Sequence, residues 1–210
     1  MSTANIKHFP SFGYLEVNYT RNDLIPLINE VEQIKKHPEN YTVLNASMSK
    51  ETNCEYELQS SKPFLKELLL PNVLNYIHYY ELFKHYTVLK NDKNLDLLTA
   101  WVNIQRKNEY NPVHAHIGLI SFVIWLEVPY EIEQEIAENK GRFCGSTTAG
   151  SFTFQYINAL GKISPYTITI DKNMLYKCII FPASMSHQVH PFFSSNGERV
   201  SVSGNFVYDV

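Results

Sequence analysis

Residues 178–206, CIIFPASMSHQVHPFFSSNGERVSVSGNF, contain the most informative pattern of this chain. An apolar run that begins at Cys178 precedes His187, and a segment that begins at Arg199 alternates polar with apolar residues. Both segments are typical of β-strands, and residues 194–197 are typical of a turn between them. We therefore expect His187 and Arg199 to lie on paired strands and to face the same interior.

The polar face of the last predicted strand begins with a cation. Its members, which share one face because they are two positions apart, are Arg199, Ser201, Ser203 and Asn205. If this face lines an interior, Arg199 can form a two-pronged salt bridge with a carboxylate, and Ser201 can add a hydroxyl. If the polar face is instead exposed to solvent, water satisfies its polar groups and no ligand is implied. The pattern alone does not decide between a polar face that lines an interior and one that is solvated.

A second group of candidate ligands lies upstream, at His114-Ala115-His116. In an extended segment these two imidazoles point the same way, so both can face one metal ion. His187 can add a third ligand, which leaves positions open for substrate and oxygen, as a non-haem iron site requires. His190 competes with His187 for this place, and each of these histidines can also be an ordinary surface or core residue.

The composition of the 210 residues excludes several classes of protein. With 44% hydrophobic residues the chain can form a sizeable core, and a formal charge of −3 with scattered lysines indicates neither a nucleic-acid nor a membrane partner. Cys54, Cys144 and Cys178 form no C-x-x-C pair, which fits a reducing compartment. Because no signal-like N-terminus and no apolar run of about 18 residues is present, we expect a cytoplasmic protein.

The predicted elements are helices first and strands second. Helical spacing covers residues 22–37 and restarts from residue 61 towards residue 89, with Pro71 interrupting the second pattern, while residues 39–60 are expected to be loop with one strand at 41–44. About six to eight strands follow residue 95, with a short helix or loop over 130–140. We expect one domain, residues 1–210, with a helical buttress over roughly 20–92 and a β sandwich or barrel over roughly 95–210.

These residues also resemble a known family, the iron(II)- and 2-oxoglutarate-dependent oxygenases of the prolyl-hydroxylase-like superfamily, and within it small oxygenases of marine bacteria and phages. The resemblance covers roughly residues 97–208 and rests on Trp101-Val102-Asn103, His114-Ala115-His116, Ser121-Phe122-Val123-Ile124-Trp125-Leu126, Phe181-Pro182-Ala183-Ser184-Met185-Ser186-His187-Gln188-Val189-His190-Pro191 and Arg199-Val200-Ser201-Val202-Ser203-Gly204-Asn205. It implies an α+β fold, a double-stranded β-helix (a cupin-like jelly roll) buttressed by the N-terminal helices.

The resemblance implies roles for individual residues. The catalytic iron(II) ligands would be His114, His116 and His187. The residues that would bind the co-substrate 2-oxoglutarate are Arg199, Ser201 and Asn103, and further candidate pocket-lining residues are Gln105 and Ser121. The implied activity is a dioxygenase that hydroxylates a peptide or a small molecule and releases succinate and CO2.

The chain departs from the family pattern at the second histidine. The wider superfamily has His-x-Asp or His-x-Glu where this chain has His116, so the site is either a three-histidine centre or one in which His116 does not bind the metal. His116-Ile117-Gly118 is also similar to the halogenase variant, in which a halide replaces the carboxylate. Phe122 and Trp125 replace a glycine and a tyrosine, so the pocket walls are expected to differ.

Two other functions stay open at this stage. One is a three-histidine, cupin-type dioxygenase that does not use 2-oxoglutarate, in which Arg199 would bind a carboxylate of the substrate itself. The other is a non-catalytic β-barrel that acts as a binding module. Neither the substrate nor the oligomeric state is indicated by a motif.

Overall fold

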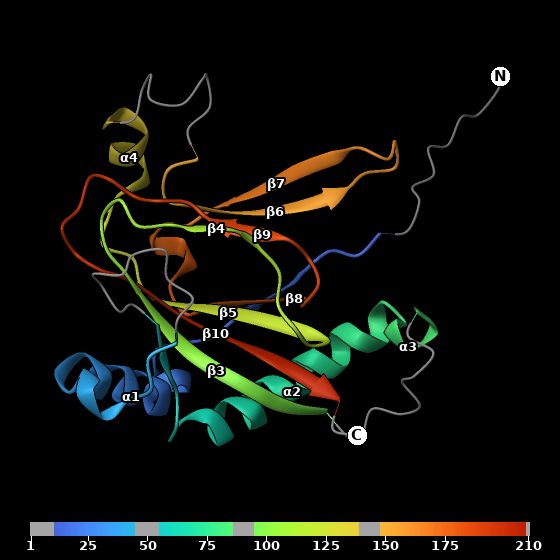
Figure 1. Cartoon of the computed structure of the whole chain (residues 1–210), viewed down its shortest axis with the longest axis horizontal. Helices are drawn as coiled ribbons and strands as arrows, with labels where there is room; N and C mark the ends of the chain where they lie inside the picture. The colour runs from blue at the N-terminus through green and yellow to red at the C-terminus, as the bar shows by residue number, and fades with distance from the viewer. Residues whose placement is uncertain (1–10, 45–54, 86–94, 139–147, 209–210) are drawn as a thin grey trace.

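The structure is a computed structural model that describes residues 11–44, 55–85, 95–138 and 148–208 (Figure 1). Its helical elements are η1 (Asn22–Leu24), α1 (Ile25–Lys36), η2 (Pro38–Asn40), α2 (Lys62–Tyr79), α3 (Leu82–His85), α4 (Ile132–Glu138) and η3 (Lys172–Met174). Its strands are β1 (Leu15–Asn18), β2 (Glu55–Glu57), β3 (Leu95–Gln105), β4 (Asn111–His114), β5 (Ile120–Glu127), β6 (Ser151–Ile157), β7 (Ile163–Thr169), β8 (Lys177–Pro182), β9 (His187–Val189) and β10 (Arg199–Tyr208).

The strands form two facing antiparallel sheets. The larger sheet has the order β1-β8-β5-β10-β3-β2, and the smaller has the order β4-β9-β6-β7. Figure 1 shows α1 and α2 on the outer side of the larger sheet, while the smaller sheet lies on its other side. The sheets do not close into a barrel. The predicted helical first half and β-rich second half are therefore present, with ten strands in the described part of the chain.

The larger sheet is buried on both faces, which explains the unbroken apolar run of β5. Phe122 and Ile124 belong to the core beneath the helices, whereas Val123 and Trp125 belong to the core between the sheets. A strand covered on both sides needs apolar residues at successive positions rather than at alternate ones. The second of these cores provides the apolar surroundings of the cavity described below.

Helix α2 continues through Pro71, although the sequence pattern indicated an interruption there. Leu69, Val73 and Ile77 are completely buried in the core between helices and sheet. Proline in a helix interior removes one backbone hydrogen bond. Because apolar side chains before and after Pro71 pack in the same core, the helix is held straight through this position by tertiary contacts.

The region expected to be loop contains β2, a strand that the sequence pattern did not indicate. Only an isolated bridge, Val43 to Tyr56, occurs in the segment where a strand was expected, and β2 pairs with β3 at the edge of the larger sheet. The sequence also predicts a turn at residues 91–94 and a flexible segment, rich in glycine and threonine, at residues 141–150. The turn and most of the second segment lie outside the described residues.

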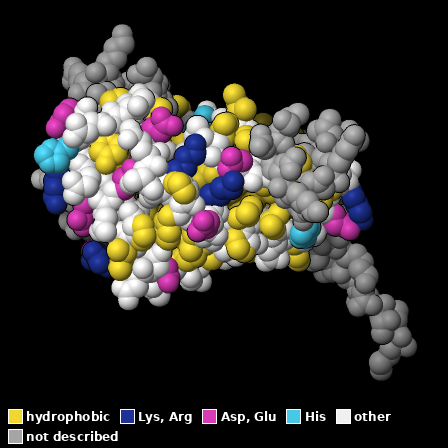
Figure 2. Space-filling model, turned by 90° about the horizontal axis from the view of Figure 1, so that it is seen from below, with side chains coloured by type: hydrophobic (Ala, Val, Ile, Leu, Met, Phe, Trp, Pro, Cys, Tyr) yellow, Lys and Arg dark blue, Asp and Glu magenta, His cyan; other side chains and the backbone are white. Residues whose placement is uncertain are grey.

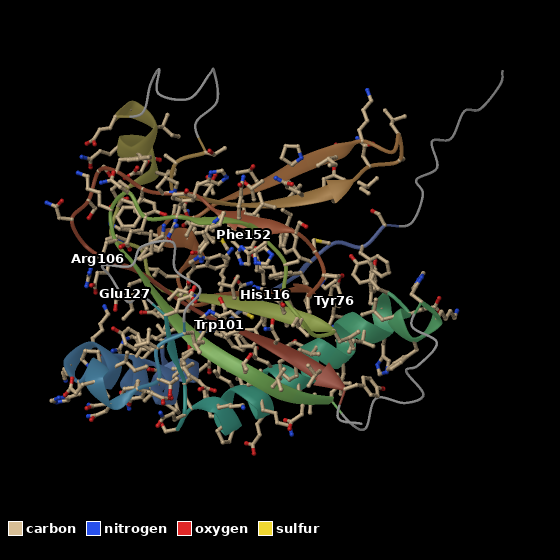
Figure 3. All side chains as sticks on the ribbon, viewed as in Figure 1. Tyr76, Trp101, Arg106, His116, Glu127 and Phe152 are labelled. Atoms are coloured by element: carbon tan, nitrogen blue, oxygen red, sulfur yellow. The ribbon has the colours of Figure 1, made fainter. Side chains whose placement is uncertain are left out.

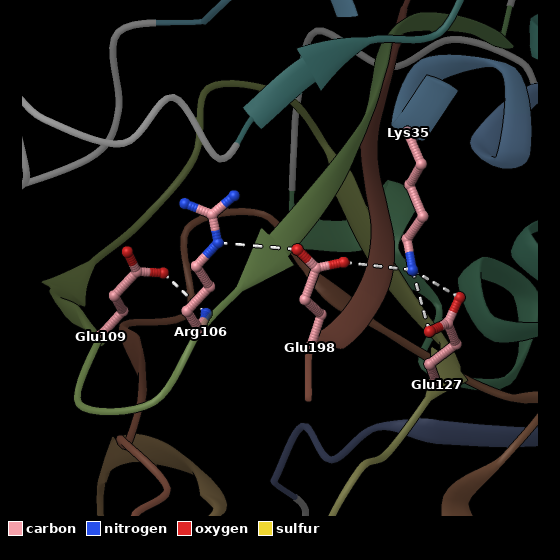
Figure 4. A network of polar contacts seen from close by, with 5 residues as sticks. All are labelled: Lys35, Arg106, Glu109, Glu127 and Glu198. Atoms are coloured by element: carbon pink, nitrogen blue, oxygen red, sulfur yellow. Dashed lines mark hydrogen bonds and ion pairs between the residues drawn. The ribbon is translucent and has the colours of Figure 1, made fainter. Parts of the chain in front are cut away.

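A network of charged side chains joins α1 to the ends of three strands (Figure 4). Lys35 contacts Glu127 at 2.8 Å and Glu198 at 3.3 Å, and Arg106 contacts Glu198 at 3.6 Å. The Glu109 carboxylate accepts a hydrogen bond of 2.7 Å from the Arg106 backbone N–H. Exposed pairs of this kind contribute about 0–1 kcal/mol each, so the network mainly fixes where β10 begins.

His187 and Arg199 do not lie on paired strands, contrary to the expectation from the sequence. His187 opens β9, which pairs with β4 and β6 in the smaller sheet, and Arg199 opens β10, which pairs with β3 and β5 in the larger sheet. The segment between them crosses from one sheet to the other. The buried Glu135 carboxylate holds this segment by accepting hydrogen bonds from the backbone N–H groups of Phe193 and Ser194.

On the outer face that carries the helices, the described side chains form no large patch of a single charge. Figure 2 shows acidic, basic and apolar side chains interspersed on the face seen from below. Within the described ranges, no helix combines the length and the apolar character needed to cross a bilayer.

Candidate metal centre

Three histidines from two neighbouring segments converge between the sheets. His114 at the end of β4 is paired directly with His187 at the start of β9, and His116 follows β4 with its backbone N–H donating to the Ala183 carbonyl at 2.9 Å. Each ring offers one nitrogen to a group in which all three nitrogens lie within 4.8 Å of one another. The three predicted histidines therefore lie together. The pairing of β4 with β9 brings His187 to the other two.

Two of the rings are oriented by backbone carbonyls. Nδ1 of His114 donates to the Pro112 carbonyl at 2.7 Å, and Nδ1 of His187 donates to the Met185 carbonyl at 2.9 Å. A carbonyl can only accept, so each Nδ1 carries the proton and each Nε2 keeps a free lone pair. This is the arrangement that orients histidine ligands in metal sites.

The surroundings keep the imidazoles of His116 and His187 neutral. Burial lowers the pKa of His187 to about 3 and that of His116 to about 4. Phe152 stacks on His187 with ring centroids 5.2 Å apart, and Trp101 lies 5.4 Å from His116. Figure 3 shows Trp101 and His116 in the space between the sheets, with Phe152 on the smaller sheet. Neutral imidazoles are the form that binds Fe(II), so the donor set fits a divalent transition metal.

His190 lies outside this group. Its Nε2 is 3.0 Å from the Thr153 hydroxyl and 3.0 Å from the Gln188 side-chain nitrogen, while its backbone carbonyl accepts from Arg199. Of the two competing histidines, His187 is thus the one that joins His114 and His116.

Arg199 lies buried in the same interior, with only 2% of its surface exposed. Nε and Nη2 both donate to Gln105 Oε1, at 3.2 Å and 2.6 Å, and Nη2 also donates to the His190 carbonyl at 2.7 Å. Nη1 donates to the Tyr130 hydroxyl at 2.8 Å and to the Gly150 carbonyl at 3.1 Å. All five N–H groups therefore have partners, and every partner is neutral.

This guanidinium is a buried cation without a bound anion. Among the described residues no carboxylate forms an ion pair with Arg199; its remaining neighbours are the rings of Tyr130 and Phe192, 5.9 Å and 5.6 Å away. Burial of an uncompensated charge is costly. The position is therefore suited to an anionic ligand, which would take the place of the Gln105 oxygen in front of the guanidinium fork.

One cavity of about 580 Å³ joins the histidines to Arg199. The residues of the predicted set that line it are Asn103, Gln105, His114, His116, His187, Arg199 and Ser201. Ser121 does not line it: its hydroxyl donates to the Asn205 side chain at 2.7 Å in the buried sheet. The substituted positions Phe122 and Trp125 do contribute to the walls.

Sequence reasoning missed three other polar residues of this cavity, Glu55, Thr99 and Asn111. Glu55 lies in a segment without clear periodicity, and Asn111 precedes a proline, so neither stands out by pattern. The only available signal was the short distance in sequence between Asn111 and His114.

Two facing sheets enclose a cavity with three imidazoles, an arrangement that suits a single metal ion with open coordination positions. Residues 99–205 match the model of a family described as "Putative 2OG-Fe(II) oxygenase", where 2OG is 2-oxoglutarate. The match spans more than half of the chain, so this protein belongs to that family and is a 2-oxoglutarate-dependent oxygenase. A comparison with curated proteins found no match to the sequence.

Solved structures share the fold at low sequence identity. A prolyl-4-hydroxylase from Pseudomonas putida has a TM-score of 0.56 and 11% identity, with 95% of each chain covered. The α-ketoglutarate-dependent epimerase SnoN from nogalamycin biosynthesis has a TM-score of 0.55 and 12% identity, over 94% of this chain and 78% of that one. AviO1 from Streptomyces viridochromogenes Tue57 has a TM-score of 0.55 and 9% identity, over 94% and 90%. The fold is the expected α+β double-stranded β-helix with helices on its larger sheet.

Proposed function

We propose that this protein binds iron(II) through His114, His116 and His187 and hydroxylates a peptide or small-molecule substrate. The observation that carries the proposal is the convergence of three imidazole nitrogens within 4.8 Å, in a cavity that also contains a buried arginine. Iron(II) and 2-oxoglutarate would supply the chemistry: O2 is the oxidant, one of its oxygen atoms enters succinate as 2-oxoglutarate loses CO2, and the other is inserted into a substrate C–H bond.

The histidines supply three neutral donors and hold them in a fixed orientation. The carbonyls of Pro112 and Met185 accept hydrogen bonds from Nδ1 of His114 and His187, so the Nε2 atom of each ring is left for the metal. With three protein ligands, the remaining coordination positions are free for co-substrate and oxygen. His116 occupies the place where the wider superfamily has a carboxylate, so the three proposed ligands contribute no negative charge to the centre.

Arg199 is the proposed anchor for the far carboxylate of 2-oxoglutarate. Its backbone partner, the His190 carbonyl, is three residues beyond His187, and a strand advances about 3.3 Å per residue, so the guanidinium lies roughly 10 Å along the chain direction from the imidazole. This separation suits a ligand that has one end at the metal ligands and the other end at the guanidinium. Ser201 and Asn103, which line the cavity between these ends, are proposed to add hydrogen bonds.

The apolar walls are proposed to keep water from the reacting groups. Phe152 and Phe181 cover His187, each with its ring centroid 5.2 Å from the imidazole, and Trp125 lines the cavity from the larger sheet. Exclusion of water strengthens the interaction between Arg199 and a bound carboxylate because the local dielectric is lower.

The test is binding and turnover with purified protein. We expect one iron(II) per chain, 2-oxoglutarate binding that requires Arg199, and slow succinate formation even without a substrate. Protein that binds neither iron nor 2-oxoglutarate contradicts the proposal. Oxygen uptake that is the same with and without 2-oxoglutarate would instead support a three-histidine dioxygenase of another type.

A further inference from the structure

The cavity contains an acidic group, Glu55, that the proposed oxygen chemistry does not use. Glu55 opens β2 at the edge of the larger sheet, is only 4% exposed and lines the cavity. Its strand partner on β3 is Asn103, a residue of the same cavity wall. The side chain of Asn111 forms a hydrogen bond with the carboxyl group, and burial raises the pKa of Glu55 to about 7.

Two other buried glutamates of this chain show how a purely structural carboxylate is satisfied here. Glu30 accepts hydrogen bonds from the backbone N–H groups of residues 59, 60 and 61, and Glu135 accepts from those of residues 193 and 194. Both lie outside the cavity lining. Glu55 differs in each respect, because its partner is a side-chain amide and its carboxyl group borders open space.

No cation in the described part of the chain compensates Glu55. None of the ion pairs between described residues includes it. Arg199 lines the same cavity, but its strand β10 is separated from β2 by β3, about 10 Å away at the usual strand spacing, and its N–H groups are directed to other acceptors. The cavity therefore has an acidic group and a cationic group at separate places.

We propose that Glu55 binds a positively charged nitrogen of the substrate, an amino or guanidino group. A buried carboxylate is costly unless it is paired, and a cationic ligand supplies a partner that the described residues do not provide. Asn111, which contacts Glu55, begins β4, and His114 ends it, so the charged group is bound about 10 Å along this strand from the metal centre. The reacting carbon is thus several bonds from the nitrogen. The proposal rests on the proposed function for the reaction itself.

The experiment measures binding, so it does not depend on turnover. L-lysine and L-arginine are titrated into the full-length protein by calorimetry, with and without iron(II), beside L-norleucine and L-citrulline, whose side chains are uncharged. The variant is Glu55→Gln, which keeps size and hydrogen bonding but removes the charge. The matched control is Glu57→Gln, two residues along the same strand and outside the cavity lining.

We expect at least one cationic amino acid to bind more tightly than its uncharged analogue. Glu55→Gln should weaken that binding about tenfold or more, because one partner of a buried charge pair is lost, whereas Glu57→Gln should not. Iron(II) and 2-oxoglutarate affinities should be unchanged in both variants. The proposal is overturned if neither cation binds up to roughly 10 mM, a range that includes single ion-pair affinities, or if Glu55→Gln leaves the preference for cations intact. Failure of iron or 2-oxoglutarate binding in the wild type would refute the proposed function instead.

Discussion

His114 and His187 are paired directly across β4 and β9, and their ring centroids are 4.3 Å apart. The pairing places two imidazoles from segments that are distant in sequence at one point of the smaller sheet. His116 joins them from the loop that leads to the larger sheet, with its ring 4.9 Å from that of His114 and 5.0 Å from that of His187. The candidate metal centre therefore depends on the register of a short strand pair.

Loss of the His187 ring should remove the metal. We expect His187→Gln to lower iron(II) affinity by more than about 100-fold, because even losses outside the ligand set cost about 10–100-fold. Metal content after desalting, measured by elemental analysis, checks this result. His190→Gln is the matched control and should retain iron, since His190 contacts Thr153 and Gln188 rather than the other histidines. Equal iron loss in both variants would contradict the assignment of His187.

The role of His116 can be separated from that of its neighbours by two substitutions. His116→Ala should lower iron(II) affinity by about tenfold or more, whereas His116→Asp should restore binding because it supplies the carboxylate that the wider superfamily uses. Iron(II) titration followed by calorimetry measures both. If His116→Ala binds iron as tightly as the wild type, His116 is not a ligand and the third position is open.

Gln105 should control access to Arg199. Gln105→Glu places a carboxylate where the amide oxygen now accepts from both Nε and Nη2 of Arg199, so the variant neutralises its own anion site. We expect 2-oxoglutarate affinity to fall about tenfold or more while iron(II) affinity is unchanged. Gln105→Leu is the companion variant and should bind 2-oxoglutarate at least as well as the wild type. An unaltered affinity in Gln105→Glu would show that 2-oxoglutarate is not anchored at Arg199.

The ionisation of Glu55 should make stability depend on pH in a defined direction. Burial raises its pKa from 4.5 to about 7 in the folded protein, so the folded state holds the proton where the unfolded state has lost it. The ligand-free protein should therefore lose stability as pH rises through this interval, by at most about 3 kcal/mol. Glu55→Gln lacks this dependence. Thermal unfolding between about pH 5 and pH 8 should show a Tm difference in favour of the variant that grows with pH; a constant difference would contradict the shift.

Several features of the fold were predictable from local patterns. The helical spacing before residue 37 and after residue 61 corresponds to α1 and α2, and the apolar run after residue 119 corresponds to β5. The interruption predicted at Pro71 was wrong, because buried residues before and after it pack into one core and outweigh a single lost hydrogen bond. The alternating segment from Arg199 was also visible, since alternation is a property of one strand.

The candidate site shows which features local sequence patterns cannot predict. Residue chemistry together with the family resemblance indicated His114, His116, His187 and Arg199 as a group, and the fold collects them around one cavity. The sequence did not indicate that His187 and Arg199 belong to opposite sheets, that Gln105 fills the guanidinium fork, or that Glu55 is buried beside Asn111. Periodicity and side-chain type are encoded residue by residue, but strand pairing and burial arise from contacts between distant segments, which appear only when the whole chain is packed.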